Sequence, residues 1–167
     1  MGDVQSDTLH ADTIDAFRGM IYMLRNGREI PLRLSRSSDK FSWGIAPQDD
    51  WLQAGGAEPP PVFDFVFHSQ GENRLHFNIC GTGLNGAKKL GISRNGYLGL
   101  YAHAEVNHYW KLEPLEWTAN GLVCHWRDHQ GHQVKAMLDT PHYTPGNVYL
   151  LNVEEGEPHA FLVKRID

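Results

Sequence analysis

The sequence predicts an all-β protein built from three related strand-turn-strand units. Turn-forming residues are frequent, Asn-Gly dipeptides separate alternating apolar runs, and one segment recurs along the chain. The 167 residues include 17 Gly and nine Pro, which favours many turns between short elements over a few long helices. A chain of this length is typical of one domain with its own core. We therefore expect residues 1–167 to form a single β domain.

Asn-Gly is the strongest short signal for a tight hairpin turn, because both residues tolerate a positive φ. The dipeptide occurs at residues 26–27, 85–86, 95–96 and 120–121. Alternating apolar residues flank the first and third copies and predict hairpins with one apolar face; they are Ile21, Met23, Ile30, Leu32 and Leu34, and Leu90, Ile92, Leu98 and Leu100. A further hairpin is expected from residues 122–127, a turn at 128–131 and a strand at 134–138.

An internal repeat indicates how these hairpins combine. Residues 97–115 align with residues 148–166 without a gap, which places Leu100 on Leu151 and Trp110 on Phe161. A fainter first copy has strands at residues 41–45 and 62–67. The predicted units are then about 17–70, 71–116 and 117–166. Because each unit alone would expose an apolar face, a closed threefold packing is the simplest way to bury all three.

The second predicted unit resembles a known family. The run LGISRNGYLGLY, followed by YWKLEPL, resembles the unit of β-trefoil proteins, in particular the ricin-B-like and fungal lectins and the fascin-like actin binders. The likeness is close only over residues 88–115. It implies a β-trefoil, in which a six-stranded barrel is capped by three hairpins. One short N-terminal helix is also expected, over residues 7–18, where Asp7 is a suitable cap.

Charge and terminal composition exclude several partner classes. The net charge is −5 and no basic stripe is present, whereas phosphate backbones are bound by clustered Lys and Arg; we expect no nucleic-acid partner. The chain has no cationic start with an apolar run behind it and no stretch of about 18 apolar residues. No membrane insertion and a cytoplasmic location are therefore predicted. Cys80 and Cys124 are expected to be buried thiols in a reducing compartment.

Motifs for catalysis or metal binding are weak. The spacing Gly81-x-Gly83-x-x-Gly86 matches a dinucleotide fingerprint, but Gly91 and the turn at 95–96 leave no room for the helix that must follow it. His125, His129 and His132 have ligand spacing only on a helix, and here they fall around a hairpin turn. No nucleophile motif or carboxylate pair is recognisable. We therefore expect a protein that is not an enzyme and that uses no cofactor and no metal.

The resemblance implies a lectin that holds sugars in shallow loop pockets. In ricin-like units an Asn-Gln pair rims the pocket before a core Trp; here Asn107 matches and His108 replaces the Gln. Tyr101 is the expected stacking ring, with His103 nearby. Two further loops are candidates on composition alone, one with Trp51 and Asp50, the other with Asp139, His142 and Tyr143. The expected partners are glycans or glycoproteins.

Protein recognition is the rival interpretation. The Pro-bearing loops at residues 54–61 and 140–146 would suit a protease inhibitor, and the fascin-like resemblance suggests an actin or cytoskeletal partner. Function on such a scaffold lies in the loops, so the fold does not decide between the two classes. A homodimer would raise avidity for multivalent glycans, and the oligomeric state stays open.

Overall fold

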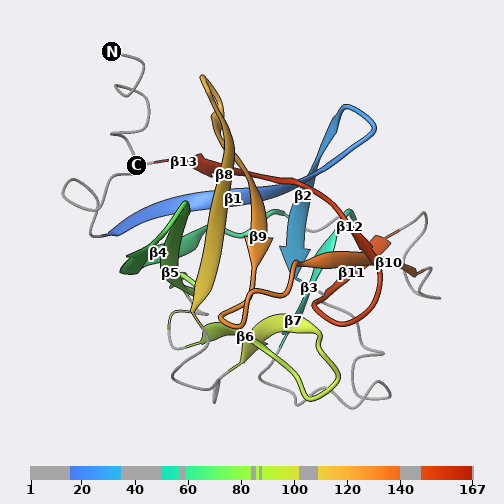
Figure 1. The fold of residues 1–167 in the computed structure, drawn as a ribbon. Helices are drawn as coiled ribbons and strands as arrows, with labels where there is room; N and C mark the ends of the chain where they lie inside the picture. The colour runs from blue at the N-terminus through green and yellow to red at the C-terminus, as the bar shows by residue number, and fades with distance from the viewer. Residues whose placement is uncertain are drawn as a thin grey trace.

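The chain folds into antiparallel β structure (Figure 1). The computed structural model describes residues 16–34, 50–56, 59–83, 86, 88–101, 109–139 and 148–166. These residues form thirteen strands. They are β1 (Ala16–Arg25), β2 (Arg28–Leu34), β3 (Asp50–Ala54), β4 (Phe63–Gly71), β5 (Arg74–Cys80), β6 (Lys89–Ile92), β7 (Leu98–Tyr101), β8 (Trp110–Thr118), β9 (Gly121–Arg127), β10 (Lys135–Asp139), β11 (Val148–Asn152), β12 (Glu157–Pro158) and β13 (Phe161–Arg165).

Nine of these strands close into a barrel. Hydrogen-bonded neighbours follow the order β3-β2-β1-β13-β9-β8-β5-β6-β7, and β7 returns to β3 through the pair Trp51 and Gly99. The other four strands, β4, β10, β11 and β12, lie outside this ring. The predicted β-trefoil, with six barrel strands and hairpins confined to a cap, is therefore wrong. The hairpins β1–β2 and β6–β7 are part of the barrel itself, and β3 links them by pairing with both β2 and β7. Closure leaves these strands no open edge.

The unit boundaries expected from the repeat fall inside strands. The boundary at residues 70 and 71 lies in β4, and the one at 116 and 117 lies in β8. β4 and β5 pair with each other across the first boundary, as do β8 and β9 across the second. The hairpins β4–β5 and β8–β9 thus join neighbouring expected units, and each hairpin contributes apolar residues from two units to the core.

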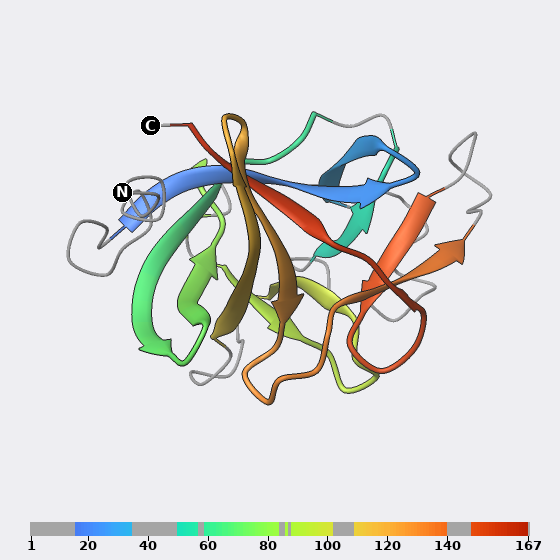
Figure 2. The same cartoon turned by 45° about the horizontal axis from the view of Figure 1, so that its top comes forward.

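β1 is shared by three neighbours. Residues 16–19 pair with β4, residues 19–23 with β13, and residues 22–25 with β2. β4 also pairs with β5, so β1, β4, β5, β8, β9 and β13 form a shorter closed circuit within the same sheet. β1 and β13 are paired in antiparallel register and lie next to each other (Figure 2). The first and last strands of the chain are thereby held together.

The hairpins predicted at two Asn-Gly dipeptides are confirmed. Arg25 pairs with Arg28 around Asn26 and Gly27, whose φ angles of 51° and 76° are those of a type I′ turn. Ile92 pairs with Leu98 around the second turn. At residues 120–121 a hairpin also forms, but the pair that closes it is Thr118 and Gly121, so the turn lies one residue earlier than the dipeptide. Residues 84 and 85 lie outside the described residues.

Two other sequence expectations need correction. The turn at 128–131 forms, with Asp128 N donating to His132 O at 2.8 Å, and Gln133 bridges back to Arg127 at the end of β9. The expected hairpin stops there, because β10 pairs with β11 and β12 instead of β9. Of the expected helix, residues 16–18 belong to β1 and residues 7–15 lie outside the described residues, as does the expected strand at 41–45. In β1 burial alternates every second residue, which is the period of a strand.

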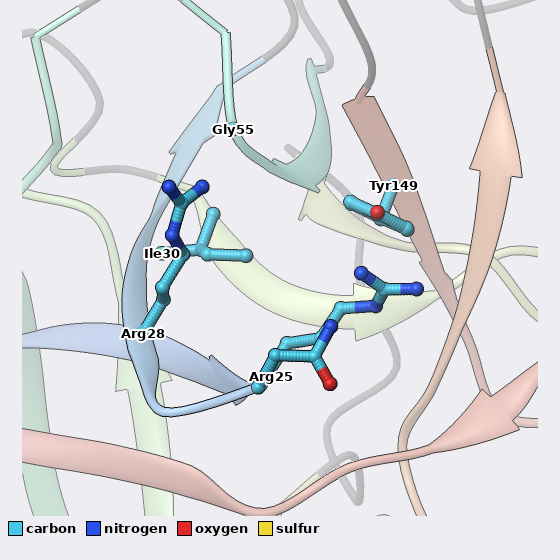
Figure 3. Close-up of a pocket in the computed structure, with 6 residues that line it drawn as sticks. Arg25, Arg28, Ile30, Gly55 and Tyr149 are labelled. Carbon is cyan, nitrogen blue, oxygen red and sulfur yellow. The ribbon is translucent and has the colours of Figure 1, made fainter.

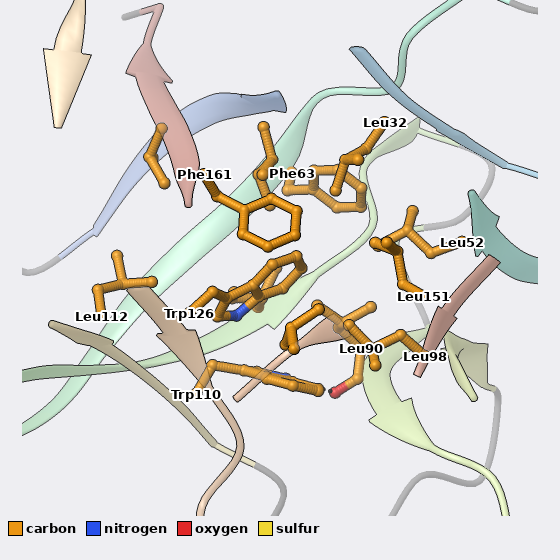
Figure 4. Packing of buried hydrophobic residues seen from close by; sticks show 14 of the residues in the cluster. Leu32, Leu52, Phe63, Leu90, Leu98, Trp110, Leu112, Trp126, Leu151 and Phe161 are labelled. Atoms are coloured by element: carbon orange, nitrogen blue, oxygen red, sulfur yellow. Dashed lines mark hydrogen bonds between the residues drawn. The ribbon is translucent and has the colours of Figure 1, made fainter. Parts of the chain in front are cut away.

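Aromatic rings fill the core. Phe17 stacks on Phe65 with ring centroids 4.6 Å apart. Trp126 contacts both Trp110 and Phe161, at 5.3 and 5.2 Å (Figure 4). The two residues equated by the internal repeat therefore pack on the same side chain, because β8 and β13 both flank β9. Most of the barrel's cohesion comes from burying these large rings.

The two central tryptophans differ in one hydrogen bond, and this predicts different costs for the same substitution. The Trp110 indole N–H donates to Leu90 O at 3.1 Å, whereas the buried Trp126 N–H has no hydrogen-bond acceptor among the described residues. We expect Trp110→Phe to lower the free energy of unfolding by about 1 kcal/mol more than Trp126→Phe, the net value of one hydrogen bond. Urea unfolding of both variants measures this difference. Equal losses would contradict it.

Candidate functional site

Three segments far apart in the sequence meet beside the barrel. They are the tip of the β1–β2 hairpin, the residue after β3, and the start of β11. The β2–β3 ladder ends with Leu32 opposite Ala54, and the β3–β11 ladder places Tyr149 opposite the same Ala54. Gly55 N then donates to Pro31 O at 3.1 Å. These contacts fix the three segments around one hollow.

The hollow is a pocket of about 450 Å³, a size that suits a small ligand. Figure 3 shows the labelled side chains around it, with the Arg25 guanidinium toward Tyr149 and that of Arg28 beside Ile30. The lining residues are Arg25, Asn26, Arg28, Ile30, Gly55 and Tyr149. At Gly55 and at the next glycine φ is 93° and 100°, a conformation that side-chain-bearing residues rarely adopt.

Tyr149 faces the pocket because of strand alternation. Its neighbours Val148 and Leu150 are buried on the other face of β11, and Tyr149 itself is half-buried. The Arg25 guanidinium lies 5.2 Å from the centroid of the Tyr149 ring, a contact that holds both groups in place. The pocket therefore offers an aromatic ring beside two guanidiniums, each of which carries five N–H donors.

The structure brings together three of the sequence-predicted site residues. β3 pairs with β7, so Asp50 and Trp51 lie beside the strand that ends at Tyr101. Trp51 stacks on Tyr97 with centroids 4.7 Å apart and an interplanar angle of 21°. The Tyr101 hydroxyl donates to the carbonyl oxygen of Tyr97 at 3.1 Å. Trp51, Tyr97 and Tyr101 thus form one aromatic surface, which is separate from the pocket of Figure 3.

The side chains of the other predicted site residues are not described. His103, Asn107, His108, His142 and Tyr143 lie outside the described residues. For Asp50 and Asp139 the structure describes only the strand positions, at the start of β3 and at the end of β10. Their roles in sugar binding stay predictions.

Sequence reasoning missed the pocket residues Arg25, Asn26, Arg28 and Tyr149. One signal for them was present: an Asn-Gly turn with two residues between its flanking positions puts Arg25 and Arg28 opposite each other. No comparable signal exists for Tyr149. Its place depends on the pairing of β11 with β3, whose partners are nearly a hundred residues apart in the chain.

A second polar cluster lies on β4 and β5. A β-bulge shifts the register between Phe67 and Ser69, which places His68 and Ser69 close to His76. The Ser69 hydroxyl is 2.7 Å from His68 Nδ1 and 2.8 Å from His76 Nδ1. Tyr109 stacks on His68 with centroids 4.3 Å apart. Burial lowers the pKa of His76 below its ordinary value of 6.5, and the nearby charges of Lys111, His68 and Arg74 lower it further.

Two histidines of the sequence motif, His125 and His132, each contact a different carboxylate. His125 Nδ1 lies 3.4 Å from Glu113 Oε1, and His132 Nδ1 lies 3.1 Å from Asp128 Oδ2. Arg127 also binds Glu113, at 2.9 Å, and its hydrogen bond is the main cause that lowers the pKa of that carboxyl. The two histidines thus belong to different ion pairs on either side of the 128–131 turn.

The lowered pKa of His76 predicts a pH-dependent stability. Because the unfolded chain takes up the proton first, the folded state loses stability as the pH falls below 6.5, by at most about 1.4 kcal/mol per pH unit for one proton. Urea unfolding at pH 7.5, 6.5 and 5.5 measures the fall. We expect His76→Gln to reduce it and the control His132→Gln, outside the cluster, to retain it. A fall of unchanged size in His76→Gln would contradict the assignment.

Within the described ranges, no helix is long and apolar enough to cross a lipid bilayer. In the same part of the chain, no three His, Cys, Asp or Glu side chains gather in a way that could hold a metal ion. Comparison with known proteins assigns no family: no protein-family model matches this chain, and no curated protein matches it.

Proposed function

We propose that the protein is a carbohydrate-binding protein, a lectin, and that the pocket of Figure 3 holds the sugar. The observation that carries this proposal is the joint presence of the Tyr149 ring and three polar side chains around one hollow. A sugar has hydroxyls that need hydrogen-bond partners and C–H faces that pack on apolar groups. The pocket offers both kinds of surface.

The polar contacts come from the hairpin tip. Arg25 and Arg28 are donors, and the Asn26 amide both donates and accepts. The apolar contacts come from Ile30 and the ring of Tyr149. Because the tip is a two-residue turn closed by strand pairing, its backbone is ordered before the ligand arrives, which lowers the entropy cost of binding.

A cytoplasmic location is part of the proposal. Cys80 and Cys124 are both free thiols, and Cys124 is fully buried in the core. Burial raises the pKa of each thiol, which keeps both in the unreactive protonated form. Thiols of this kind are typical of a reducing compartment.

A glycan array with the full chain tests the function. We expect the wild-type protein to bind a defined set of glycans and Tyr149→Ala to weaken those signals about tenfold or more, equivalent to about 1.4 kcal/mol. Tyr149→Phe keeps the ring and should retain most of the binding. Thermal unfolding of each variant establishes that it is folded.

The array also distinguishes the rival sites and classes. Loss of binding in Tyr101→Ala with no effect of Tyr149→Ala would move the sugar to the Trp51–Tyr97–Tyr101 surface. Binding to no glycan by the folded wild-type protein would contradict the lectin proposal and leave protein recognition, by protease inhibition or by binding of a cytoskeletal partner, as the class to test.

A further inference from the structure

Two arginines face each other across the β1–β2 hairpin. Arg25 and Arg28 are the closing pair of the turn, directly opposite in the antiparallel register. Like charges in this position destabilise a hairpin. The pair therefore weakens the element that carries it, unless an anion lies between the two side chains.

The described residues supply no such anion. Glu29 is next to Arg28 in the chain but lies on the other face of the strand, where its carboxylate accepts from Lys164 Nζ at 3.0 Å. Neither Arg25 nor Arg28 has a carboxylate at ion-pair distance among the described residues, and no acidic side chain lines the pocket. Among the residues that the structure describes, no carboxylate therefore compensates the positive charge of the pocket.

Other arginines of the sheet are compensated. Arg18, on the same strand as Arg25, lies 3.3 Å from Asp64. Arg127 makes two hydrogen bonds to Glu113, at 2.9 and 3.1 Å. The chain as a whole carries a charge of −5, so a cationic pair with no carboxylate beside it in the described ranges is a local feature of the pocket.

Each arginine of the pair carries a group suited to an anion. A guanidinium is planar and binds the two oxygens of a carboxylate or sulfate with parallel N–H donors. Arg25 is held against the Tyr149 ring, and Figure 3 shows both guanidiniums at the pocket that Tyr149 lines. An acidic group bound there would lie beside the same ring that packs on the sugar.

We propose that the pocket selects acidic saccharides, sugars that carry a sulfate or a carboxylate, and that the acidic group binds between Arg25 and Arg28. The inference rests on the proposed lectin function and adds the class of sugar. It accounts for a charge pair that costs stability in the free protein.

The test compares matched glycans that differ only in the acidic group, sulfated or sialylated against neutral, on one array. We expect the acidic member of each bound pair to bind about tenfold or more tightly, with the preference lost in Arg28→Gln and weakened by added salt. Arg28→Lys, which keeps the charge but loses the paired donors, should retain part of it. Arg94→Gln, an exposed arginine of the β6–β7 turn outside the pocket, is the matched control and should behave as wild type.

Thermal unfolding separates this inference from the function on which it rests. Without ligand, Arg28→Gln should be at least as stable as the wild type, because a like-charge pair is removed. Equal binding of neutral and acidic glycans would overturn the inference and leave the lectin function standing. Stabilisation of the wild type by inorganic sulfate, with no glycan bound, would overturn both and show a site for free anions.

Discussion

The structure depends on the pairing of β1 with three different strands. Its ten residues pair with β4, β13 and β2 in turn, so β1 belongs both to the nine-stranded ring and to the shorter circuit through β4. Without β1 both closed circuits of the sheet would open and expose strand edges. The last residues of β1 form the hairpin with β2, so the strand shared by both circuits also presents Arg25 to the pocket.

Local parts of the fold could be predicted from the sequence, whereas the closure of the sheet could not. The hairpins at Asn26-Gly27 and Asn95-Gly96 follow from turn residues between alternating apolar runs, and they form as expected; φ is positive at both residues of the first dipeptide and at Gly96 of the second. The repeat equated Trp110 with Phe161, and both pack on Trp126, but the threefold arrangement inferred from that repeat does not form. The pair of Trp51 with Gly99, which closes the nine-stranded ring, joins distant segments, and no local pattern specifies it.

The candidate site divides in the same way. The two-residue turn places Arg25 opposite Arg28, so this pair of like charges could have been predicted from the sequence. Tyr149 enters the pocket only because β3 lies between β2 and β11, which is a property of the sheet order. The resemblance directed attention to Tyr101 and Asn107, because it matched side-chain types in one unit; it carried no information about which hollow the strand order builds.

A nuclear magnetic resonance titration of the ¹⁵N-labelled protein with a bound acidic glycan from the array tests the central claim most directly. Backbone amide shifts report where a ligand binds without altering the protein. The account predicts the largest changes at residues 25–28, 55 and 149, which come from three segments far apart in the sequence that meet at the pocket. Changes concentrated at residues 97–101, with those of the β1–β2 hairpin unmoved, would contradict it.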